Sequence, residues 1–260
     1  MKTLRIQCMR IPCITLIHVN HIDYPRKFHS MTTWCILVVD ESFKAVAFTD
    51  FHGSNEAFDA AKNKVHNGRW NCVIVAGDIV NHDYEQAKKR LVELAEIPLF
   101  FVPGNMDDPA LASWTGTELV RPLHGIGASL GNVFLVGLGG SPKGPFSTPF
   151  QISEESAVRI LNRAVARPMK GPLILVSHCP PRGTKLDIVS SGEHVGSVAA
   201  RDFVDTFRPV LVISGHVHEA KGVDMIGGST VLNTGPAFRG NYAEVRIGDK
   251  VTVSLESFRA

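Results

Sequence analysis

Short runs of Val, Ile, Leu and Phe alternate with longer, more polar segments from Trp34 to the end of the chain. Such runs are typical of strands buried on both faces, and their alternation with helical segments predicts an α/β fold. Strands are expected at 33–40, 43–50, 71–78, 97–105, 132–140, 171–178, 208–216, 229–238, 242–248 and 250–258. Helices are expected at 54–67, 82–96, 109–116, 153–166 and 198–207.

The connections between these elements indicate how some of the strands pair. The first two runs, 33–40 and 43–50, are separated by only two residues, which predicts a hairpin. The last three runs, between residues 229 and 258, follow one another closely, which predicts an antiparallel meander. Because the chain contains no internal repeat and no linker, we expect residues 31–260 to form a single domain.

The first 30 residues form a separate segment. They begin basic and turn apolar over 11–19, as a signal peptide would, but the apolar stretch is short and no small residues mark a cleavage site. We therefore expect an N-terminal extension, 1–30, that is poorly ordered or laid on the surface. The alternatives are a signal peptide and a natural start at Met31.

The composition argues against several classes of protein. The 260 residues are 44% apolar and 20% charged, as in an ordinary globular protein. A net charge of +2 argues against a dedicated binder of long nucleic acid, and no apolar run reaches the ~18 residues of a membrane span. The five cysteines form no CxxC pair, which favours a reduced, cytoplasmic protein. Histidine, the commonest metal ligand, occurs eleven times.

Five of the expected strands end in residues that bind metals. These are two aspartates, one asparagine and four histidines: Asp50, His52, Asp78, Asn105, His178, His216 and His218. Because the carboxyl ends of strands in an α/β sheet form the ligand crevice, we expect these side chains to meet at one edge. In Asp50-x-His52 and His216-x-His218 the paired side chains point to the same side of an extended chain. The glycines before three of the ligands allow tight turns.

These ligands are too many for one tetrahedral ion. They fit two divalent ions with a carboxylate between them. Mixed imidazole and carboxylate ligation suits Mn, Fe, Zn, Ni or Co better than Ca. The sequence therefore predicts a dinuclear metal centre.

In order and spacing, the five blocks resemble the calcineurin-like metallophosphoesterases, whose pattern is D-x-H, G-D, G-N, a lone H and G-H-x-H. Here the blocks read Asp50-Phe51-His52, Gly77-Asp78, Gly104-Asn105, His178 and Gly215-His216-Val217-His218. The loops 141–150 and 191–197 also resemble those of small prokaryotic phosphoesterases. The resemblance implies a four-layer sandwich of two mixed β-sheets flanked by helices.

The resemblance also implies how the ligands divide between two metals. The first metal would be held by Asp50, His52, Asp78 and His218. The second would share Asp78 as a bridge and be completed by Asn105, His178 and His216. A hydroxide bridging the metals would then attack a small phosphate ester, which is the expected partner of the site.

The chain departs from the family at the position where many members carry a histidine that protonates the leaving group. That position is Met106, which cannot donate a proton. Loss of a general acid costs about 10²–10⁴ in rate. His82, Asp107 and His194 are the candidates to replace it, and Asp187 and Arg182 are candidates for substrate contacts. Similar members without that histidine tend to be phosphodiesterases, which favours phosphodiester hydrolysis here.

Other functions remain open on the sequence alone. Some proteins of the family are metal-binding interaction scaffolds with little catalysis, although those typically lack several ligand histidines that this chain keeps. A phosphomonoesterase or a nuclease is the further alternative, and the low net charge counts against the nuclease. We expect neither a long nucleic acid nor a membrane as partner, and the oligomeric state stays open.

Overall fold

The computed structural model describes residues 7–11, 14–18, 35–37, 42–166 and 168–258, and the chain divides into two compact units, Met1–Ser42 and Phe43–Ala260. In the first unit, three antiparallel strands form a sheet in the order β1 (Gln7–Ile11), β2 (Ile14–His18) and β3 (Cys35–Leu37). The expected boundary between an extension at 1–30 and a domain at 31–260 falls within 19–34, outside the described residues. The division therefore stays a prediction.

The second unit contains two mixed sheets of six strands each. The first sheet consists of β4 (Phe43–Phe48), β5 (Cys72–Ala76), β6 (Leu99–Val102), β7 (Val120–Pro122), β14 (Asn241–Ile247) and β15 (Val251–Ser257). Its order is β15-β14-β4-β5-β6-β7, with β4 to β7 parallel and the other two strands antiparallel to their neighbours.

The second sheet consists of β8 (Gly127–Leu130), β9 (Val133–Leu138), β10 (Leu173–Ser177), β11 (Leu211–Ser214), β12 (Gly222–Ile226) and β13 (Ser229–Asn233). Its order is β12-β13-β11-β10-β9-β8, with the four inner strands parallel and the two edge strands antiparallel. Both sheets therefore align the carboxyl ends of their central parallel strands.

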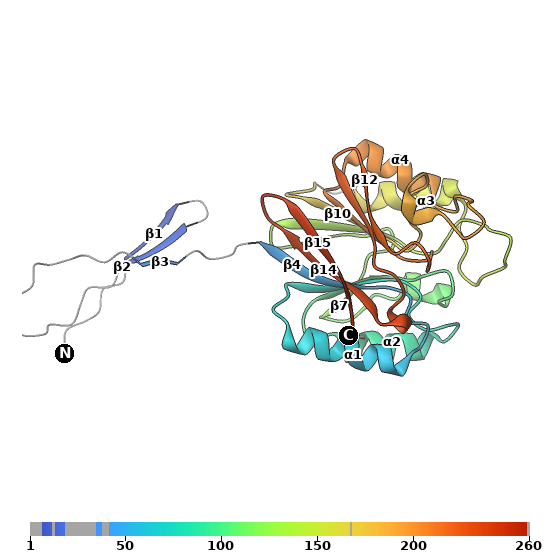
Figure 1. Cartoon of the computed structure of the whole chain (residues 1–260), viewed down its shortest axis with the longest axis horizontal. Helices are drawn as coiled ribbons and strands as arrows, with labels where there is room; N and C mark the ends of the chain where they lie inside the picture. The colour runs from blue at the N-terminus through green and yellow to red at the C-terminus, as the bar shows by residue number, and fades with distance from the viewer. Residues whose placement is uncertain (1–6, 12–13, 19–34, 38–41, 167, 259–260) are drawn as a thin grey trace, which may run out of the picture. The chain divides into compact units, whose positions relative to one another are not determined.

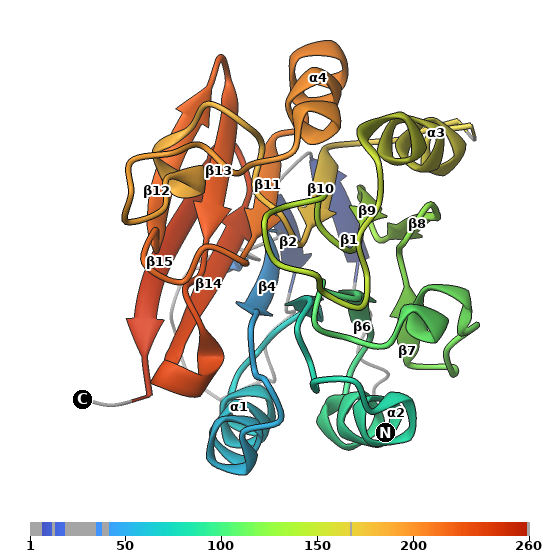
Figure 2. The ribbon, with the colours of Figure 1, turned by 90° about the vertical axis from the view of Figure 1, so that its right-hand side faces the viewer.

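Helices cover the outer face of each sheet, so the unit has four layers (Figure 1). The helices are α1 (Asn55–Asn67), α2 (Tyr84–Leu94), α3 (Glu154–Ala164) and α4 (Val198–Phe207). The first two lie against the first sheet and the last two against the second, on opposite sides of the sandwich (Figure 2). This arrangement confirms the expected four-layer α/β sandwich.

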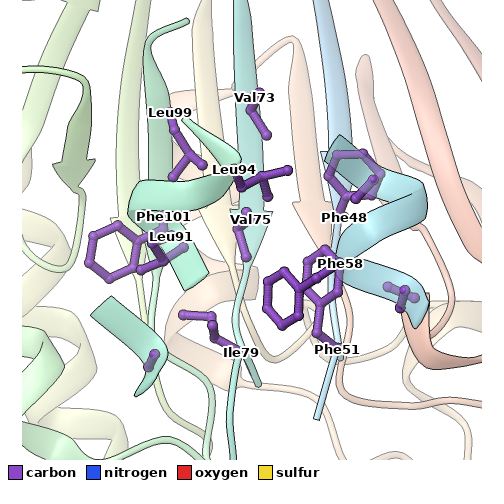
Figure 3. Packing of buried hydrophobic residues seen from close by; sticks show 14 of the residues in the cluster. Phe48, Phe51, Phe58, Val73, Val75, Ile79, Leu91, Leu94, Leu99 and Phe101 are labelled. Atoms are coloured by element: carbon purple, nitrogen blue, oxygen red, sulfur yellow. The ribbon is translucent and has the colours of Figure 1, made fainter. Parts of the chain in front are cut away.

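Alternation along the strands explains why the sheets are buried on both faces. On β5, Val73 and Val75 pack against α1 and α2, whereas Ile74 faces the core between the two sheets. Figure 3 shows the helix side of this packing, where Phe51 and Phe58 stack with ring centroids 4.1 Å apart. The central strands read as continuous apolar runs because both of their faces are covered.

Most of the expected helices are confirmed. Side chains of Ser54, Asp83, Ser153 and Ser197 cap the four α-helices by accepting a hydrogen bond from a backbone N–H of the first turn. The segment expected as a helix at 109–116 forms the short 3₁₀ helix η1 (Pro109–Ser113). Among the described residues, no helix is long and apolar enough to cross a bilayer.

Two expected strand pairings are wrong. The hairpin between 33–40 and 43–50 does not form, because β4 pairs with β5 and β14 and the described part of the earlier run, β3, pairs with β2. The antiparallel meander expected at 229–258 is also wrong, because its first strand belongs to the other sheet. β13 is parallel to β11 in the second sheet, and only β14 and β15 form a hairpin in the first sheet.

Candidate metal centre

The seven ligand-type residues follow five parallel strands whose carboxyl ends lie at one edge of the sandwich. The first sheet contributes two residues after β4, one after β5 and one after β6: Asp50, His52, Asp78 and Asn105. The second sheet contributes one residue after β10 and two after β11: His178, His216 and His218. The structure brings these side chains together across the two sheets.

One group of ligands surrounds a carboxylate oxygen of Asp50. Nε2 of His52 and Nε2 of His218 lie 3.3 Å apart, and Nε2 of His218 lies 3.4 Å from Oδ1 of Asp50. Oδ2 of Asp78 is 3.6 Å from Nε2 of His52. Oδ1 of Asp50 is buried and has no hydrogen-bond partner. A buried carboxylate oxygen facing imidazole nitrogens without a hydrogen bond fits a divalent cation.

A second group gathers around His178. Its Nε2 lies 3.5 Å from Oδ1 of Asp78 and 2.9 Å from Oδ1 of Asn105. The ring of His216 is adjacent, with its centroid 5.1 Å from that of His178. Asp78 thus presents one oxygen to each group, as a carboxylate between two cations would.

The hydrogen bonds of two histidines leave Nε2 free to bind a cation. Nδ1 of His178 lies 2.8 Å from the carbonyl oxygen of Ala76, which can only accept, so Nδ1 carries the proton. Nδ1 of His52 lies 2.8 Å from Oδ1 of Asn81, and donation to that oxygen has the same effect. Sequence reasoning missed Asn81, because no strand-end pattern marks a residue that acts through another side chain.

A further residue that the sequence missed holds the second sheet's ligand loop. Nδ2 of Asn233 donates to the carbonyl oxygens of Gly215 and Val217, at 3.3 and 2.9 Å. These carbonyls flank His216, so the buried amide fixes the turn that presents this ligand and His218. Sequence reasoning missed Asn233 because it lies within the strand expected at 229–238, where no functional residue was expected.

Burial and mutual charge shift the pKa values in the centre. Burial raises the pKa of Asp50, but the nearby imidazoles of His218, His178 and His52 outweigh it and hold the pKa below its ordinary value. Burial and the charge of Asp50 raise the pKa of Asp78 to about 7. Burial lowers the pKa of His216 to about 3, which keeps its imidazole neutral. Neutral imidazoles beside carboxylates are the protonation state that a divalent cation needs.

Left-handed backbone conformations concentrate at this edge. Six described non-glycine residues have a positive φ, and one of them, Arg208, ends α4. The other five lie in the ligand loops, with φ between 47° and 67°: Asp50, His52, Asp78, His82 and His216. Non-glycine residues in this region are strained and persist where the surrounding structure holds them, which is common at functional sites.

Of the three glycines that precede the candidate ligands, one has the role expected and two have a different role. Gly77 has a φ of 94°, as a tight turn requires, but neither Gly104 nor Gly215 has a positive φ. Gly104 is required by close approach instead, because a Cβ there would clash with the Asp78 carboxylate. A Cβ on Gly215 would clash with Thr49 and approach the Asp50 carboxylate. These two glycines let ligand loops pack directly against ligand side chains.

The three candidate proton donors have different surroundings. His82 is exposed, and its backbone N–H donates to the carbonyl oxygen of Met106 at 3.0 Å. Asp107 is fully buried and accepts three backbone N–H groups, from Ile79, Val80 and Gly104. Burial and the Asp78 charge raise the pKa of Asp107 to about 7. Its bonds tie together the loops after β5 and β6.

His194 lies in the loop after β10. Its side chain is 41% exposed, and its Nδ1 lies 2.8 Å from Oδ1 of Asp187. Asp187, expected as a substrate contact, is fully buried and accepts the N–H groups of Gly183, Thr184 and Gly196. Its contacts assign it to the internal structure of this loop.

An aromatic side chain that the sequence did not single out borders the centre. The ring centroid of Phe238 lies 5.5 Å from that of His52 and 5.3 Å from that of His218. The exposed Arg239 follows, with its guanidinium carbon 5.4 Å from the Phe238 ring centroid. Both belong to the short helix η3 (Ala237–Arg239), which replaces the end of the strand expected at 229–238.

Known proteins are similar to this chain over most of its length. The family model described as calcineurin-like phosphoesterase matches residues 43–220. The uncharacterized protein MJ1162 of Methanocaldococcus jannaschii is 31% identical over 205 residues, which cover 74% of this chain and 88% of that protein.

Solved structures share the fold. The protein TT1561 of Thermus thermophilus is similar with a TM-score of 0.66 and 18% identity, over 84% of this chain and 99% of that one. GAP50, described as the anchor in the inner membrane complex of Plasmodium, is similar with a TM-score of 0.54 and 13% identity, over 84% and 85% of the two chains. At these identities the solved structures establish the four-layer fold alone.

Proposed function

The chain belongs to the calcineurin-like phosphoesterase family, and we propose that it hydrolyses small phosphodiesters with two divalent metal ions, manganese among the candidates. The observation that carries the proposal is the arrangement of Asp50 and Asp78. Asp50 turns a buried, unpartnered oxygen toward two imidazoles, and Asp78 presents one oxygen to each group of histidines. When bound, two divalent ions would supply a water of lowered pKa as nucleophile and offset the charge of the phosphoryl oxygens.

The protein's own groups would prepare the site for that chemistry. Ala76 and Asn81 orient His178 and His52 so that each Nε2 faces the centre. Asn105 directs its amide oxygen at His178, which leaves its NH₂ group able to donate to a phosphoryl oxygen. Arg239 adds a positive charge at the border of the centre, close to Phe238. A dianionic or monoanionic phosphate ester fits these charges.

Departure of an alkoxide requires a proton, and we favour His82 as its donor. The backbone of His82 is hydrogen-bonded to Met106, it follows Asn81 directly, and its exposed ring can exchange protons with water. Both oxygens of Asp107 already accept backbone N–H groups inside the protein, which favours a positioning role. His194 belongs to the separate loop after β10 and is held by Asp187.

The central test is hydrolysis of bis-p-nitrophenyl phosphate with Mn²⁺. Wild type should turn over, and His178→Ala should lose both turnover and one bound metal, measured by metal analysis after gel filtration. His66→Ala is the matched control, because His66 is exposed and pairs with Glu96 on the helix side of the first sheet. Turnover that is faster with alkyl monoesters would overturn the phosphodiesterase assignment.

A second test addresses the proton donor. His82→Ala should slow alkyl phosphodiesters by about 10²–10⁴-fold, the contribution of a general acid. The same change should affect p-nitrophenyl esters far less, because p-nitrophenolate leaves without a proton. Equal losses for both leaving groups would assign His82 to structure instead.

The alternative from another class is a metal-binding scaffold. GAP50, which shares the fold, is described as an anchor, so this architecture occurs in a protein with that description. Metal binding without turnover of monoesters, diesters or cyclic nucleotides, across Mn, Fe, Zn, Ni and Co, would favour the scaffold.

Cleavage of DNA that weakens steeply with salt would favour a nuclease. We further propose that the partner of the site is a small phosphate ester and that the protein is cytoplasmic. We also propose that it binds neither a long nucleic acid nor a membrane.

A further inference from the structure

A pocket of about 130 Å³ opens between α1 and the η3 turn. Its walls include two helix residues, three residues of the turn and one residue that follows β15: Ala57, Ala60, Ala237, Phe238, Gly240 and Phe258. The volume is well above the roughly 10–15 Å³ that a single water needs. The pocket therefore has room for a group of several heavy atoms.

Phe238 joins this pocket to the metal centre. Phe238 is one of the residues that line the pocket, and its ring lies edge-on to His52 and His218, at an interplanar angle of 71° in both cases. The turn that carries it is fixed to the first ligand strand, because Ala237 N–H donates to the carbonyl of Thr49 and Phe238 N–H to that of Asp50. Phe238 thus borders both the pocket and the candidate metal centre.

The described walls of the pocket consist mostly of small and aromatic residues. Alanine and glycine line the sides, and among the described residues Glu56, on the first turn of α1, is the charged lining residue. Phe258 is held in place by stacking on Tyr242, with centroids 4.6 Å apart and planes at 21°. Two fixed phenyl rings separated by small side chains offer the offset and edge contacts that aromatic ligands prefer.

A positive charge lies beside Phe238, one of the residues that line the pocket. Arg239 is exposed, and its guanidinium carbon lies over the Phe238 ring, 5.4 Å from the ring centroid. An ester that places an aromatic group against Phe238 can therefore keep an anionic oxygen near this guanidinium. An alkyl chain would use the apolar walls alone.

We propose that this pocket, hereafter the aryl pocket, binds the non-leaving aromatic substituent of a phosphodiester, such as an aryl group or a nucleobase. The inference rests on the proposed phosphodiesterase function and adds the class of substrate. It predicts that the enzyme distinguishes diesters by the substituent that stays on phosphorus.

The test uses three diesters with the same p-nitrophenolate leaving group and a methyl, cyclohexyl or phenyl group as the second substituent. With Mn²⁺-loaded wild type, kcat/KM for the phenyl diester should exceed that for the methyl diester by about tenfold or more, a factor typical of apolar pockets. The cyclohexyl diester should fall clearly below the phenyl diester. Equal values for phenyl and methyl, or for phenyl and cyclohexyl, would overturn the aryl assignment.

Variants connect the preference to the pocket. Ala60→Leu keeps a good helix former on α1 and fills the pocket, so the phenyl-to-methyl ratio should fall about tenfold. Ala166→Leu, at an exposed position after α3, is the matched control and should keep the wild-type ratio. Phe258→Ala removes one aromatic wall and should also lower the phenyl-to-methyl ratio. It provides an independent test if Ala60→Leu fails to fold. A ratio unchanged in a folded pocket variant would contradict the proposal.

A binding measurement separates this inference from the proposed function. Diphenyl phosphate should raise the melting temperature of Mn²⁺-loaded wild type more than dimethyl phosphate does, and Ala60→Leu should remove the difference. If no ester is hydrolysed but this difference appears, the phosphodiesterase function fails while the aryl pocket stands. If diesters are hydrolysed without any difference between the two ligands, only the aryl pocket fails.

Discussion

The two sheets contribute unequally to the candidate metal centre. The first sheet provides every oxygen ligand, namely Asp50, Asp78 and Asn105, and one histidine, His52. The second provides nitrogen ligands alone, His178, His216 and His218. The negative charge that attracts cations therefore comes from one half of the sandwich, and the neutral donors that complete their coordination come from the other.

This division makes the centre depend on how the sheets pack together. Nδ1 of His178 reaches across to the carbonyl of Ala76, and the backbone N–H of His216 donates to Oδ2 of Asp50 at 3.1 Å. Behind these bonds, residues of both sheets share one buried core, with Ile74 from the first and Ile174 from the second. A change that shifts one sheet against the other would separate the charged ligands from the neutral ones.

The largest expected effect contrasts a charged ligand with a neutral one. Asp50→Asn keeps the shape of the side chain but removes its charge, and should lower Mn²⁺-dependent kcat/KM by about 10³-fold. His216→Asn should lower the same kcat/KM by about 10²-fold. The two values are the ends of the range of about 10²–10³ for loss of one charge-stabilising group. Calorimetric titration with Mn²⁺ should rank the affinities in the same order. Equal losses would break the distinction between the two sheets.

Close packing between the sheets can be tested at Gly215. An added Cβ would press on Thr49 and Asp50 of the first sheet, so Gly215→Ala should reduce the free energy of unfolding by about 1–3 kcal/mol, as overpacking does. Gly144→Ala is the control, since a Cβ there meets nothing within 4 Å. Urea denaturation of both variants without metal measures the difference. Equal stability would show that the sheets adjust freely at the site.

A smaller effect is expected from the residue that orients the first sheet's histidine. Asn81→Ala removes the acceptor for Nδ1 of His52 and should weaken Mn²⁺ binding by about 10–100-fold. Asn81→Asp retains an acceptor and should recover most of the affinity. Asn63→Ala, on the exposed face of α1, is the control. Failure of the aspartate to recover binding would argue against an orienting hydrogen bond.

The smallest effect concerns pH and the metal-free protein. Asp78 has a pKa raised to about 7, so the folded state binds its proton more tightly than the unfolded state. Its contribution to stability is therefore present at low pH and lost as the pH rises through about 7. Asp78→Asn has no carboxyl group at this position, so its stability should not fall for this reason as the pH rises.

Thermal melts in EDTA at pH 5 and pH 8 measure the effect. The melting temperature of Asp78→Asn minus that of wild type should increase by about 2–4 °C between the two pH values, the shift that 1 kcal/mol causes in a domain of this size. Mn²⁺ should stabilise wild type at pH 8 and not the variant. A difference that stays constant with pH would contradict the raised pKa.

The sequence predicted which candidate ligand residues meet at one edge of the sandwich better than it predicted the strand pairing. Asp78 and His178 could be placed because each follows a long apolar run, and parallel strands align their carboxyl ends. The pattern of 229–238 does not reveal its sheet, because strands of both sheets contribute to one shared core. β12 escaped prediction because Val223 and Met225 are exposed, at 44% and 54%, and its pattern is not that of a buried strand.

The supporting residues could not be predicted for a different reason. Asn81, Asn233 and Phe238 act on ligands that are distant in sequence, and their roles arise only when loops from both sheets close around the site. No local spacing marks such residues. Proton donation is proposed for His82 alone, because Asp107 and His194 are already held by contacts within the protein.

The left-handed backbone at Asp50, His52, Asp78, His82 and His216 has a consequence for how this protein can change. A non-glycine residue in this conformation costs about 1–3 kcal/mol, so glycine at any of the five would relax the chain. Selection for thermal stability alone would therefore favour substitutions at four of the candidate metal ligands and at His82, the proposed proton donor. At these positions a substitution that raises stability lowers activity. A heat-resistant variant from a screen that does not select for activity should therefore carry substitutions in these turns and bind metal poorly.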